Sequence, residues 1–343
     1  MANLSSDMNI KNIEEVERIR ISDDFAAMTT LGKRLLSGID AEFAPESGHN
    51  LLVVAADNGH AEACALVAVL AGAGVCRPQE WGVAFDYLQR SAELGWQPAQ
   101  AQLLVLAGDR DLVANAEKVR PGNTQWKNVR NSIDIAQLLA EPPKQIVSES
   151  PRMRKIAAFV PIPICNWLIA RSRDRLRRAA TYDSSTGTAT TSSSRTNSET
   201  DFNIVETDLP LLLLRERIAK VTGLPTVVME LTKVLHYEPG QQFAPHFDFI
   251  EPSTFALTHE LAVRGQRLAT FLVYLNDDYL GGETDFPRLG FRHRGQAGDA
   301  FFFANINSEG DPDHRTLHAG LAPTCGEKWM LSQWIRDRAP EGR

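Results

Sequence analysis

Long apolar runs are missing from this chain of 343 residues. No segment approaches the roughly 20 consecutive apolar residues that a membrane-spanning helix requires. The first residues contain neither the charged region nor the apolar region of a secretion signal. These absences predict a cytoplasmic protein without a membrane partner.

Cysteine is also scarce. The chain has four cysteines, and none of them stands at the close spacing of a zinc-binding pair. Cys64 and Cys165 lie in apolar segments with a helical pattern, so we expect both in the core. A reducing compartment fits this usage of cysteine.

An excess of basic charge is absent too. The formal net charge is −7, whereas general binding to nucleic acid needs a basic face. The basic cluster at residues 171–178 fits the solvated face of a helix. We therefore expect no nucleic-acid partner. A chain of this length has room for two domains with cores of their own.

Four residues near the C-terminal end indicate a chemistry. His246 and Asp248 stand two apart, so a strand would direct both side chains to one face. With His318 they form a set of two imidazoles and one carboxylate, which suits non-heme Fe(II) oxygenases because it leaves other metal positions open. Lys328 could hold the far carboxylate of a dicarboxylate cosubstrate. An H-x-D pair alone is common by chance, and the order of all four residues is what predicts hydroxylation dependent on iron and 2-oxoglutarate.

The segments around these residues have the composition of short strands. Apolar and β-branched residues dominate 227–237, 267–275, 298–303 and 328–335. Turn residues such as glycine, proline and aspartate separate them. This pattern predicts a double-stranded β-helix, or jelly roll, which can bring residues far apart in the chain to one metal.

The stretch from Tyr237 to Arg336 resembles the prolyl 4-hydroxylase branch of the 2-oxoglutarate/Fe(II) oxygenases. Six blocks of that pattern occur in order: Tyr237 with Gly240-Gln241 and the H-x-D pair, Arg267 to Thr270, Gly282 to Pro287, Leu317 to Gly320, Gly326 to Trp329, and Trp334-Ile335. A weaker likeness reaches back to about Pro151, through Phe159 to Leu168 and Arg195 to Asn197. The resemblance covers somewhat over half of the chain.

The resemblance implies a role for each matching residue. His246, Asp248 and His318 would bind Fe(II), and Lys328 would pair with the C5 carboxylate of 2-oxoglutarate. The other implied contacts are with the cosubstrate, from Tyr237, Thr270 and Trp334, and with the substrate, from Arg195, Phe243 and Arg336. The reaction would consume O2 and 2-oxoglutarate, release succinate and CO2, and hydroxylate the substrate. Ascorbate could serve as a reductant.

The sequence departs from the family pattern at several places. Phe243 stands where many members have tyrosine, Lys233 stands where glutamine is usual, and residues 252–265 form a segment of variable length. These departures keep the iron residues and leave the substrate open. A prolyl residue of a peptide or protein leads, and a free amino acid or a natural-product peptide is the alternative. We expect three further histidines at the surface or in loops: His259, His293 and His314.

A reading of a different class is a repeat-based adaptor or sensor whose oxygenase domain is inactive. The intact set of four residues argues against it. Residues 184–200 are rich in serine and threonine, and two interpretations of them stay open. Such a composition buries little surface and favours flexibility. By resemblance, the segment would instead be a lid that closes over a peptide.

The first third of the chain has a different pattern. Residues 55–63 and 91–99 match each other, and both continue into segments rich in alanine and leucine. Small residues let paired helices approach closely, and a glycine ends the first helix of each pair. The pattern resembles Sel1-like repeats, relatives of the tetratricopeptide type, over about 48–110. We expect flanking helices, such as 11–37 and 112–120, to complete the stack.

The predicted architecture is therefore an α+β chain of two domains. An α-helical repeat domain would occupy residues 1–140, and a jelly-roll oxygenase domain with flanking helices would occupy 151–338. A helix around 133–139 and a proline-containing linker at 141–150 would join them. The repeats could bind a protein partner or only stabilise the fold.

Overall fold

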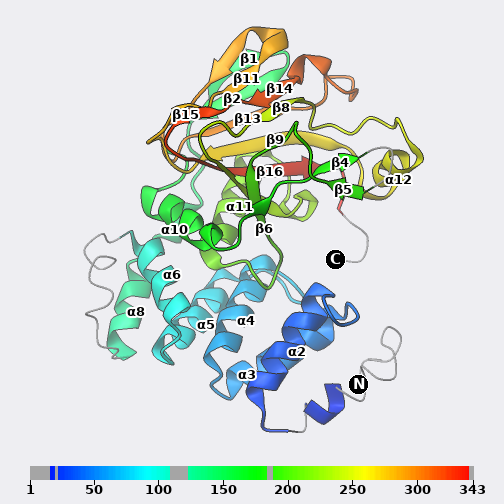
Figure 1. The fold of residues 1–343 in the computed structure, drawn as a ribbon. Coiled ribbons are helices and arrows are strands. Elements are labelled where there is room, and N and C mark those ends of the chain that lie inside the picture. Colours follow the sequence, from blue (N-terminus) through cyan, green and yellow to red (C-terminus); the bar gives the residue numbers. More distant parts are fainter. Residues whose placement is uncertain (1–15, 20–21, 109–122, 184–187, 340–343) are drawn as a thin grey trace. The chain divides into compact units, whose positions relative to one another are not determined.

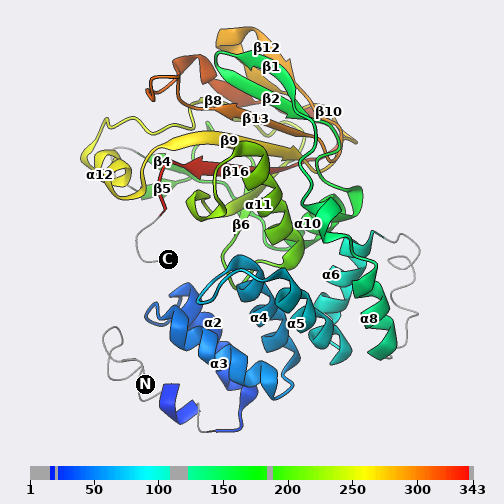
Figure 2. The ribbon, with the colours of Figure 1, turned by 180° about the vertical axis from the view of Figure 1, so that it is seen from behind.

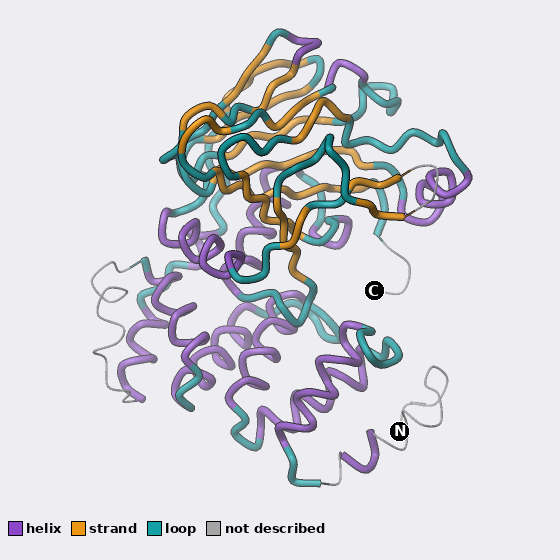
Figure 3. Tube along the Cα trace, in the orientation of Figure 1, coloured by secondary structure: helices purple, strands orange, loops and turns teal. Residues whose placement is uncertain are grey.

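The computed structural model describes residues 16–19, 22–108, 123–183 and 188–339. The chain separates into two compact units. The first comprises Met1–Leu138 with Phe202–Leu213, and the second comprises Leu139–Asp201 with Leu214–Arg343. Figure 3 shows the first unit built from helices and the sheets gathered in the second.

The first unit consists of helices joined by short turns. Its main helices are α2 (Phe25–Ser37), α3 (Pro45–Asp57), α4 (Ala61–Ala73), α5 (Trp81–Glu93), α6 (Gln97–Ala107), α8 (Asn123–Asn131) and α9 (Ile135–Leu138). The two matching segments form the turns of the pairs α3–α4 and α5–α6. Gly59 and Gly95 follow the first helix of each pair with φ angles of 85° and 91°, a left-handed conformation that glycine adopts without strain.

Small side chains allow the close packing of this unit. Ala55, Ala63, Ala92 and Ala99 are all fully buried. Of the expected flanking helices, α2 lies within 11–37, while 112–120 lies outside the described residues. None of the described helices, in either unit, has the length and apolar character needed to cross a bilayer.

The second unit contains antiparallel sheets. The largest has the strand order β1-β2-β13-β9-β16-β7-β6-β3, and a four-stranded sheet has the order β12-β11-β14-β8. The strands of the large sheet are β1 (Gln145–Glu149), β2 (Arg152–Ile156), β13 (Ala300–Ala304), β9 (Arg267–Tyr274), β16 (Lys328–Arg336), β7 (Thr232–Tyr237), β6 (Ser198–Phe202) and β3 (Arg177–Arg178). Those of the smaller sheet are β12 (Phe291–His293), β11 (Thr284–Phe286), β14 (His318–Gly320) and β8 (Phe243–His246).

Helices cover one face of the large sheet, and the four-stranded sheet lies over the other. Figures 1 and 2 show this order of layers from opposite sides, with α10 (Ile162–Arg173) and the C-terminal part of α11 (Leu209–Thr222) on the helical side. The short pairs β4–β5 (Thr181–Asp183, Thr188–Thr190) and β10–β15 (Leu280–Gly281, Pro323–Cys325) and the helix α12 (Phe255–Arg264) complete the unit. The residues of β16 alternate between the two faces, so that one set faces the smaller sheet.

Several sequence predictions are confirmed and others are wrong. The strands expected at 267–275, 298–303 and 328–335 form as β9, β13 and β16, and Cys64 and Cys165 are buried. The strand expected from residue 227 begins only at Thr232. Residues Thr226–Val228 form a 3-10 turn instead, because Pro225 fixes the backbone before them.

The expected linker and domain boundary also differ from the structure. Residues Gln145–Glu149 form β1 and pair with β2, so half of 141–150 is part of the sheet. The segment Phe202–Leu213, expected in the oxygenase domain, packs with the helices of the first unit. Its leucines reach Gly72, where an added side chain would come within 3.2 Å of Leu209. An apolar run of this kind gains stability by burial wherever a helical face is open to it.

Candidate active site

Two histidines and an aspartate meet between the sheets of the second unit. His246 ends β8, His318 begins β14, and the two stand opposite each other in the antiparallel pair. Asp248 follows two residues after His246. The possible ligand atoms of all three residues lie within 4.8 Å of one another. The sequence prediction that brought them together is confirmed at this geometric level.

Backbone contacts orient both imidazole rings. Nδ1 of His246 lies 2.9 Å from the carbonyl of Ala244, and Nδ1 of His318 lies 3.0 Å from the carbonyl of Thr316. In each ring an Nδ1–H that donates to the carbonyl leaves Nε2 as the acceptor. These Nε2 atoms lie 3.6 Å and 3.5 Å from the carboxylate oxygens of Asp248. Three electron-pair donors therefore face one point.

The protonation states suit a metal. Burial lowers the pKa of His318 to about 4, with His246 contributing in the same direction, so His318 is neutral near pH 7. Burial alone would raise the pKa of Asp248, but the imidazoles of His318 and His246 outweigh it and hold the pKa well below its usual range. In the described part of the chain, Asp248 forms no ion pair with lysine or arginine. A buried carboxylate beside two imidazoles fits a divalent cation such as Fe(II).

Two successive hydrogen bonds, from Asn305 to Thr270 and from Thr270 to Asp248, hold the carboxylate of Asp248. Thr270 on β9 donates from its hydroxyl to Oδ2 of Asp248 at 2.6 Å, and the side-chain amide of Asn305 donates to that hydroxyl at 3.0 Å. Thr270 was predicted to contact the C5 carboxylate of 2-oxoglutarate. In the structure its hydroxyl donates to Asp248, and Thr270 is not among the residues that line the cavity beside the triad. Support of this kind orients a metal ligand.

That cavity runs along β7 and β16. Residues of alternate positions line it: Lys233, Leu235 and Tyr237 from β7, and Lys328, Met330, Ser332 and Trp334 from β16. Lys328 stands opposite Tyr237 and Ser332 stands opposite Lys233. The cavity therefore has a Lys328 end and a Lys233 end, with the triad beside it.

Lys328 is a buried amino group that forms no ion pair with a carboxylate among the residues that the structure describes. Its side chain is 1% exposed, and Nζ donates to the carbonyl of Gly282 at 2.6 Å and lies 5.1 Å from the centre of the Tyr237 ring. Burial lowers its pKa to about 7. An anion in the cavity would relieve this cost of burial. The carboxylate of a dicarboxylate fits this end, as the sequence predicted.

Three other predicted residues also line the cavity. Tyr237, Phe243 and Trp334 all do so. Phe243 stacks on His246 with ring centres 3.5 Å apart, and the guanidinium of Arg267 covers the outer side of Trp334 at 3.7 Å from the ring centre. Sequence reasoning missed Thr284, which also lines the cavity. Its position inside the matched block at 282–287 was the available signal.

Arg195 also lines the cavity, and the segment around it is tied down. The backbone of Ala244 donates to Ser194 at 2.7 Å, and that of Thr196 donates to Gln242 at 2.9 Å. These bonds hold residues 194–196 against β8, as an ordered lid requires. Of the stretch 184–200, residues 184–187 lie outside the described residues.

The remaining histidines stay away from the triad. His259 and His314 are exposed, as expected, and His314 lies 3.6 Å from Glu251. His293 is half-buried on β12 instead of lying at the surface, and its ring centre lies 4.9 Å from that of Phe301.

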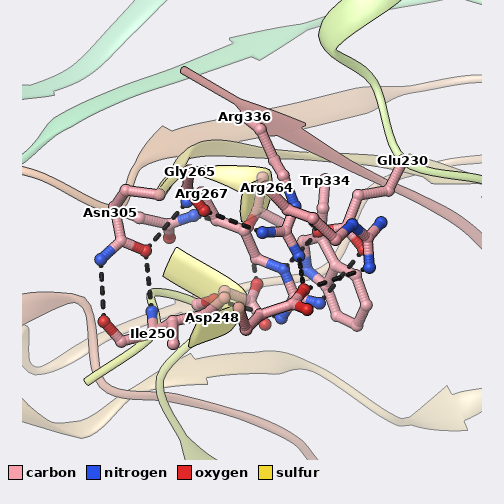
Figure 4. Close-up of polar contacts among 12 residues, drawn as sticks. Glu230, Asp248, Ile250, Arg264, Gly265, Arg267, Asn305, Trp334 and Arg336 are labelled. Carbon is pink, nitrogen blue, oxygen red and sulfur yellow. Dashed lines mark hydrogen bonds and ion pairs between the residues drawn. The ribbon is translucent and has the colours of Figure 1, made fainter. Parts of the chain in front are cut away.

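Arg336 was predicted to contact the substrate, and the structure places it in ion pairs outside the cavity. Its guanidinium is buried and pairs with Glu230 and Glu260 at 2.7 Å. Figure 4 shows Arg336 and Arg267 both directed at Glu230, beside Trp334. Arg336 therefore links the end of β16 to Glu230 and to α12, and it does not line the cavity.

The Glu230 cluster predicts a pH-dependent stability. Burial would raise the pKa of Glu230, but Arg267 and Arg336 outweigh it and lower the pKa to about 2. A lowered pKa stabilises the fold above the unfolded value near 4.5, and this stability is lost as the pH falls toward 2. We expect Glu230→Gln to lower the free energy of unfolding by about 3 kcal/mol at pH 7. Urea unfolding should show the difference shrinking between pH 4.5 and pH 2.

The exposed Glu309 provides a matched control for this measurement. Glu309→Gln should change the free energy of unfolding by less than about 0.5 kcal/mol. A Glu230→Gln variant with a loss that stays constant down to pH 2 would contradict the assignment of the lowered pKa.

Comparison with known proteins agrees with the geometry. The sequence model described as 2OG-Fe(II) oxygenase superfamily matches residues 232–336. The chain is 35% identical over 209 residues to prolyl 4-hydroxylase 1 of Arabidopsis thaliana, covering 57% of this chain and 72% of that protein. It is 35% identical over 175 residues to prolyl 4-hydroxylase subunit alpha-1 of Rattus norvegicus, covering 50% of this chain and 32% of that protein.

Two solved structures are each similar to a part of the chain. A viral collagen prolyl hydroxylase from Paramecium Bursaria Chlorella virus-1, in its 2OG complex, has 26% identity and a TM-score of 0.43, covering 55% of this chain and 98% of that one. A Sel1 repeat protein from Oxalobacter formigenes has 22% identity and a TM-score of 0.27, covering 35% and 99%.

The matched model and the relatives define the class of the protein: it is a 2-oxoglutarate-dependent dioxygenase, and Fe(II) and 2-oxoglutarate are the cofactors of that class. Within the class, the chain belongs to the prolyl 4-hydroxylase family.

Proposed function

We propose that this enzyme hydroxylates a prolyl residue of a peptide or protein while 2-oxoglutarate is decarboxylated to succinate and CO2. One observation carries the proposal. A triad of two imidazoles and a carboxylate shares one cavity with a buried lysine that pairs with no carboxylate among the described residues. The triad suits Fe(II), and the lysine suits the far carboxylate of 2-oxoglutarate.

Different residues would bind the iron and the 2-oxoglutarate. His246, Asp248 and His318 would hold Fe(II), with Thr270 fixing the carboxylate, while Lys328 would hold the C5 carboxylate of 2-oxoglutarate. When bound, iron and 2-oxoglutarate supply the reduction of O2 and the transfer of one oxygen atom to the substrate.

The apolar walls would keep water from the reacting atoms. Leu235, Leu272 and Met330 line the cavity, and such side chains exclude water from a closed site. Trp334 lines the cavity and offers a ring face against which the apolar ring of proline can pack. The segment 194–196, which backbone hydrogen bonds hold against β8, supports a lid over a polypeptide.

The proposal also covers the type of β-fold, the role of the helical unit and the cellular compartment. The two facing antiparallel sheets support a double-stranded β-helix. The helix pairs of the first unit would offer a surface for a protein substrate or partner. All four cysteines are free thiols, which supports a reducing, cytoplasmic setting.

An anaerobic titration tests the proposal. Fe(II) is added to the protein and then 2-oxoglutarate, while the visible metal-to-ligand charge-transfer band is followed. We expect a band only when both are present, followed by release of succinate when O2 and a proline-containing peptide are added. A folded protein that gives no band would favour the adaptor.

A further inference from the structure

The cavity has a second charged group at the end opposite Lys328. Glu199 on β6 accepts from Nζ of Lys233 at 2.6 Å through one oxygen and from the guanidinium of Arg195 at 2.6 Å through the other. We call these three residues the Lys233 cluster. Both cations line the cavity, and the proposed site for iron and 2-oxoglutarate uses neither of them.

The cations of the Lys233 cluster have hydrogen-bond donors that Glu199 does not use. Both carboxylate oxygens of Glu199 are engaged, and its side chain is 5% exposed. Arg195 also donates to Asn197 and to the carbonyl of Ala180. Lys233 has three donors, and among the described residues its hydrogen bond is to Glu199 alone. Its side chain is 19% exposed and lines the cavity, so Lys233 has donors left for a ligand there.

The Lys233 cluster carries a net positive charge. The two cations, Lys233 and Arg195, and the one carboxylate, Glu199, sum to one positive charge. The next carboxylate on the same strand, Asp201, is paired with Arg177 at 2.7 Å and so does not neutralise it. A positive cluster with spare donors inside a mostly apolar cavity is complementary to a carboxylate.

The two ends of the cavity lie apart along β7. Lys328 lies opposite Tyr237, and Lys233 lies four positions before Tyr237 on β7. At the rise of a strand, the Cα atoms of Lys233 and Tyr237 are roughly 13 Å apart. A 2-oxoglutarate held between Lys328 and the triad therefore leaves the Lys233 end open to the substrate, next to the ring of Trp334. Nζ of Lys233 lies 6.0 Å from the centre of the Trp334 ring.

We propose that the Lys233 cluster is a subsite for a carboxylate of the substrate. This inference rests on the proposed function and names the class of substrate: one that carries a negative charge close to the hydroxylated position. The carboxylate can come from an acidic residue next to the target in a peptide, or from the α-carboxylate of a free amino acid.

Matched pairs of substrates test this subsite. One pair is a capped peptide with proline flanked on both sides by glutamate, and the same peptide with glutamine. The other pair is free L-proline and L-prolinamide. Succinate release gives kcat/KM for each, and calorimetry gives the affinity without requiring iron or turnover. We expect the carboxylate member of one pair to be favoured about tenfold, the effect of one charge-assisted hydrogen bond.

Variants separate the cluster from general effects of charge. Lys233→Gln should reduce the preference to near one. Glu199→Gln should increase it, because the competing carboxylate is gone. Lys155→Gln, at an exposed position on β2, should leave the preference as it is. Thermal unfolding shows whether each variant is folded.

The outcomes are decisive in both directions. Preference within the peptide pair identifies an acidic peptide, and preference within the proline pair identifies a free amino acid. Equal affinity within both pairs, no binding of any of the four compounds, or a preference that survives Lys233→Gln would overturn the subsite. A missing charge-transfer band would count against the proposed function separately, because the calorimetric comparison does not depend on the band.

Discussion

Replacing His318 with alanine is expected to abolish both iron retention and turnover. The Nε2 atom of His318 faces Asp248 at 3.5 Å inside a buried triad, and two remaining donors leave the metal weakly held. Removal of a residue that merely orients a metal ligand already costs about 10- to 100-fold in affinity or activity. Loss of a ligand should cost more than about 100-fold in succinate release. Iron content after gel filtration under argon and succinate release are the two measurements.

A second histidine serves as the control for this variant. His259 on α12 is exposed, and His259→Ala should retain iron and turnover within about twofold. Full iron retention in His318→Ala, with the variant folded, would show that the metal is held elsewhere. Asp248→Ala should behave like His318→Ala, because the carboxylate supplies the charge of the site.

The triad could be predicted from sequence because its residues follow simple geometry. The close spacing of His246 and Asp248 keeps both beside one point although β8 ends at His246, and the matched blocks supplied His318 and Lys328. The resemblance did not reveal the partners of Thr270 and Arg336. A block gives the position of a residue in the chain, but the partner of its side chain depends on what the fold brings beside it. Asp248 lies beside Thr270, and Glu230 beside Arg336.

Part of the fold could also be predicted from the sequence. Short, mostly apolar segments gave β9 and β16, since a segment of that kind is buried whichever strands flank it. The start of β7 and the role of 141–150 were not predictable, because pairing with distant strands decides them. Burial of the leucines at 209–213 in the first unit likewise depends on a surface that is distant in sequence.

Lys328→Met is expected to separate cosubstrate binding from metal binding. Methionine fills the buried space without a charge, so the variant should retain iron. The KM for 2-oxoglutarate should rise about 100-fold, the value of a buried charge-assisted contact of about 3 kcal/mol. Iron content and a titration of the charge-transfer band with 2-oxoglutarate measure the two properties. Lys155→Met is the exposed control. Equal loss of iron in Lys328→Met and His318→Ala would show that the lysine supports the metal instead.

The pKa of Lys328 adds a signature that a merely structural lysine would lack. Burial lowers this pKa to about 7, so above pH 7 the free enzyme has lost the proton from Nζ. A bound carboxylate favours the charged form and raises the pKa again. Binding of 2-oxoglutarate at pH 8 should therefore take up close to one proton, and its affinity should fall as the pH rises above 7. Calorimetry in buffers of different ionisation enthalpy measures the uptake, and Lys328→Met should abolish it. Binding at pH 8 without proton uptake would mean that Lys328 stays charged in the empty cavity or does not meet the carboxylate.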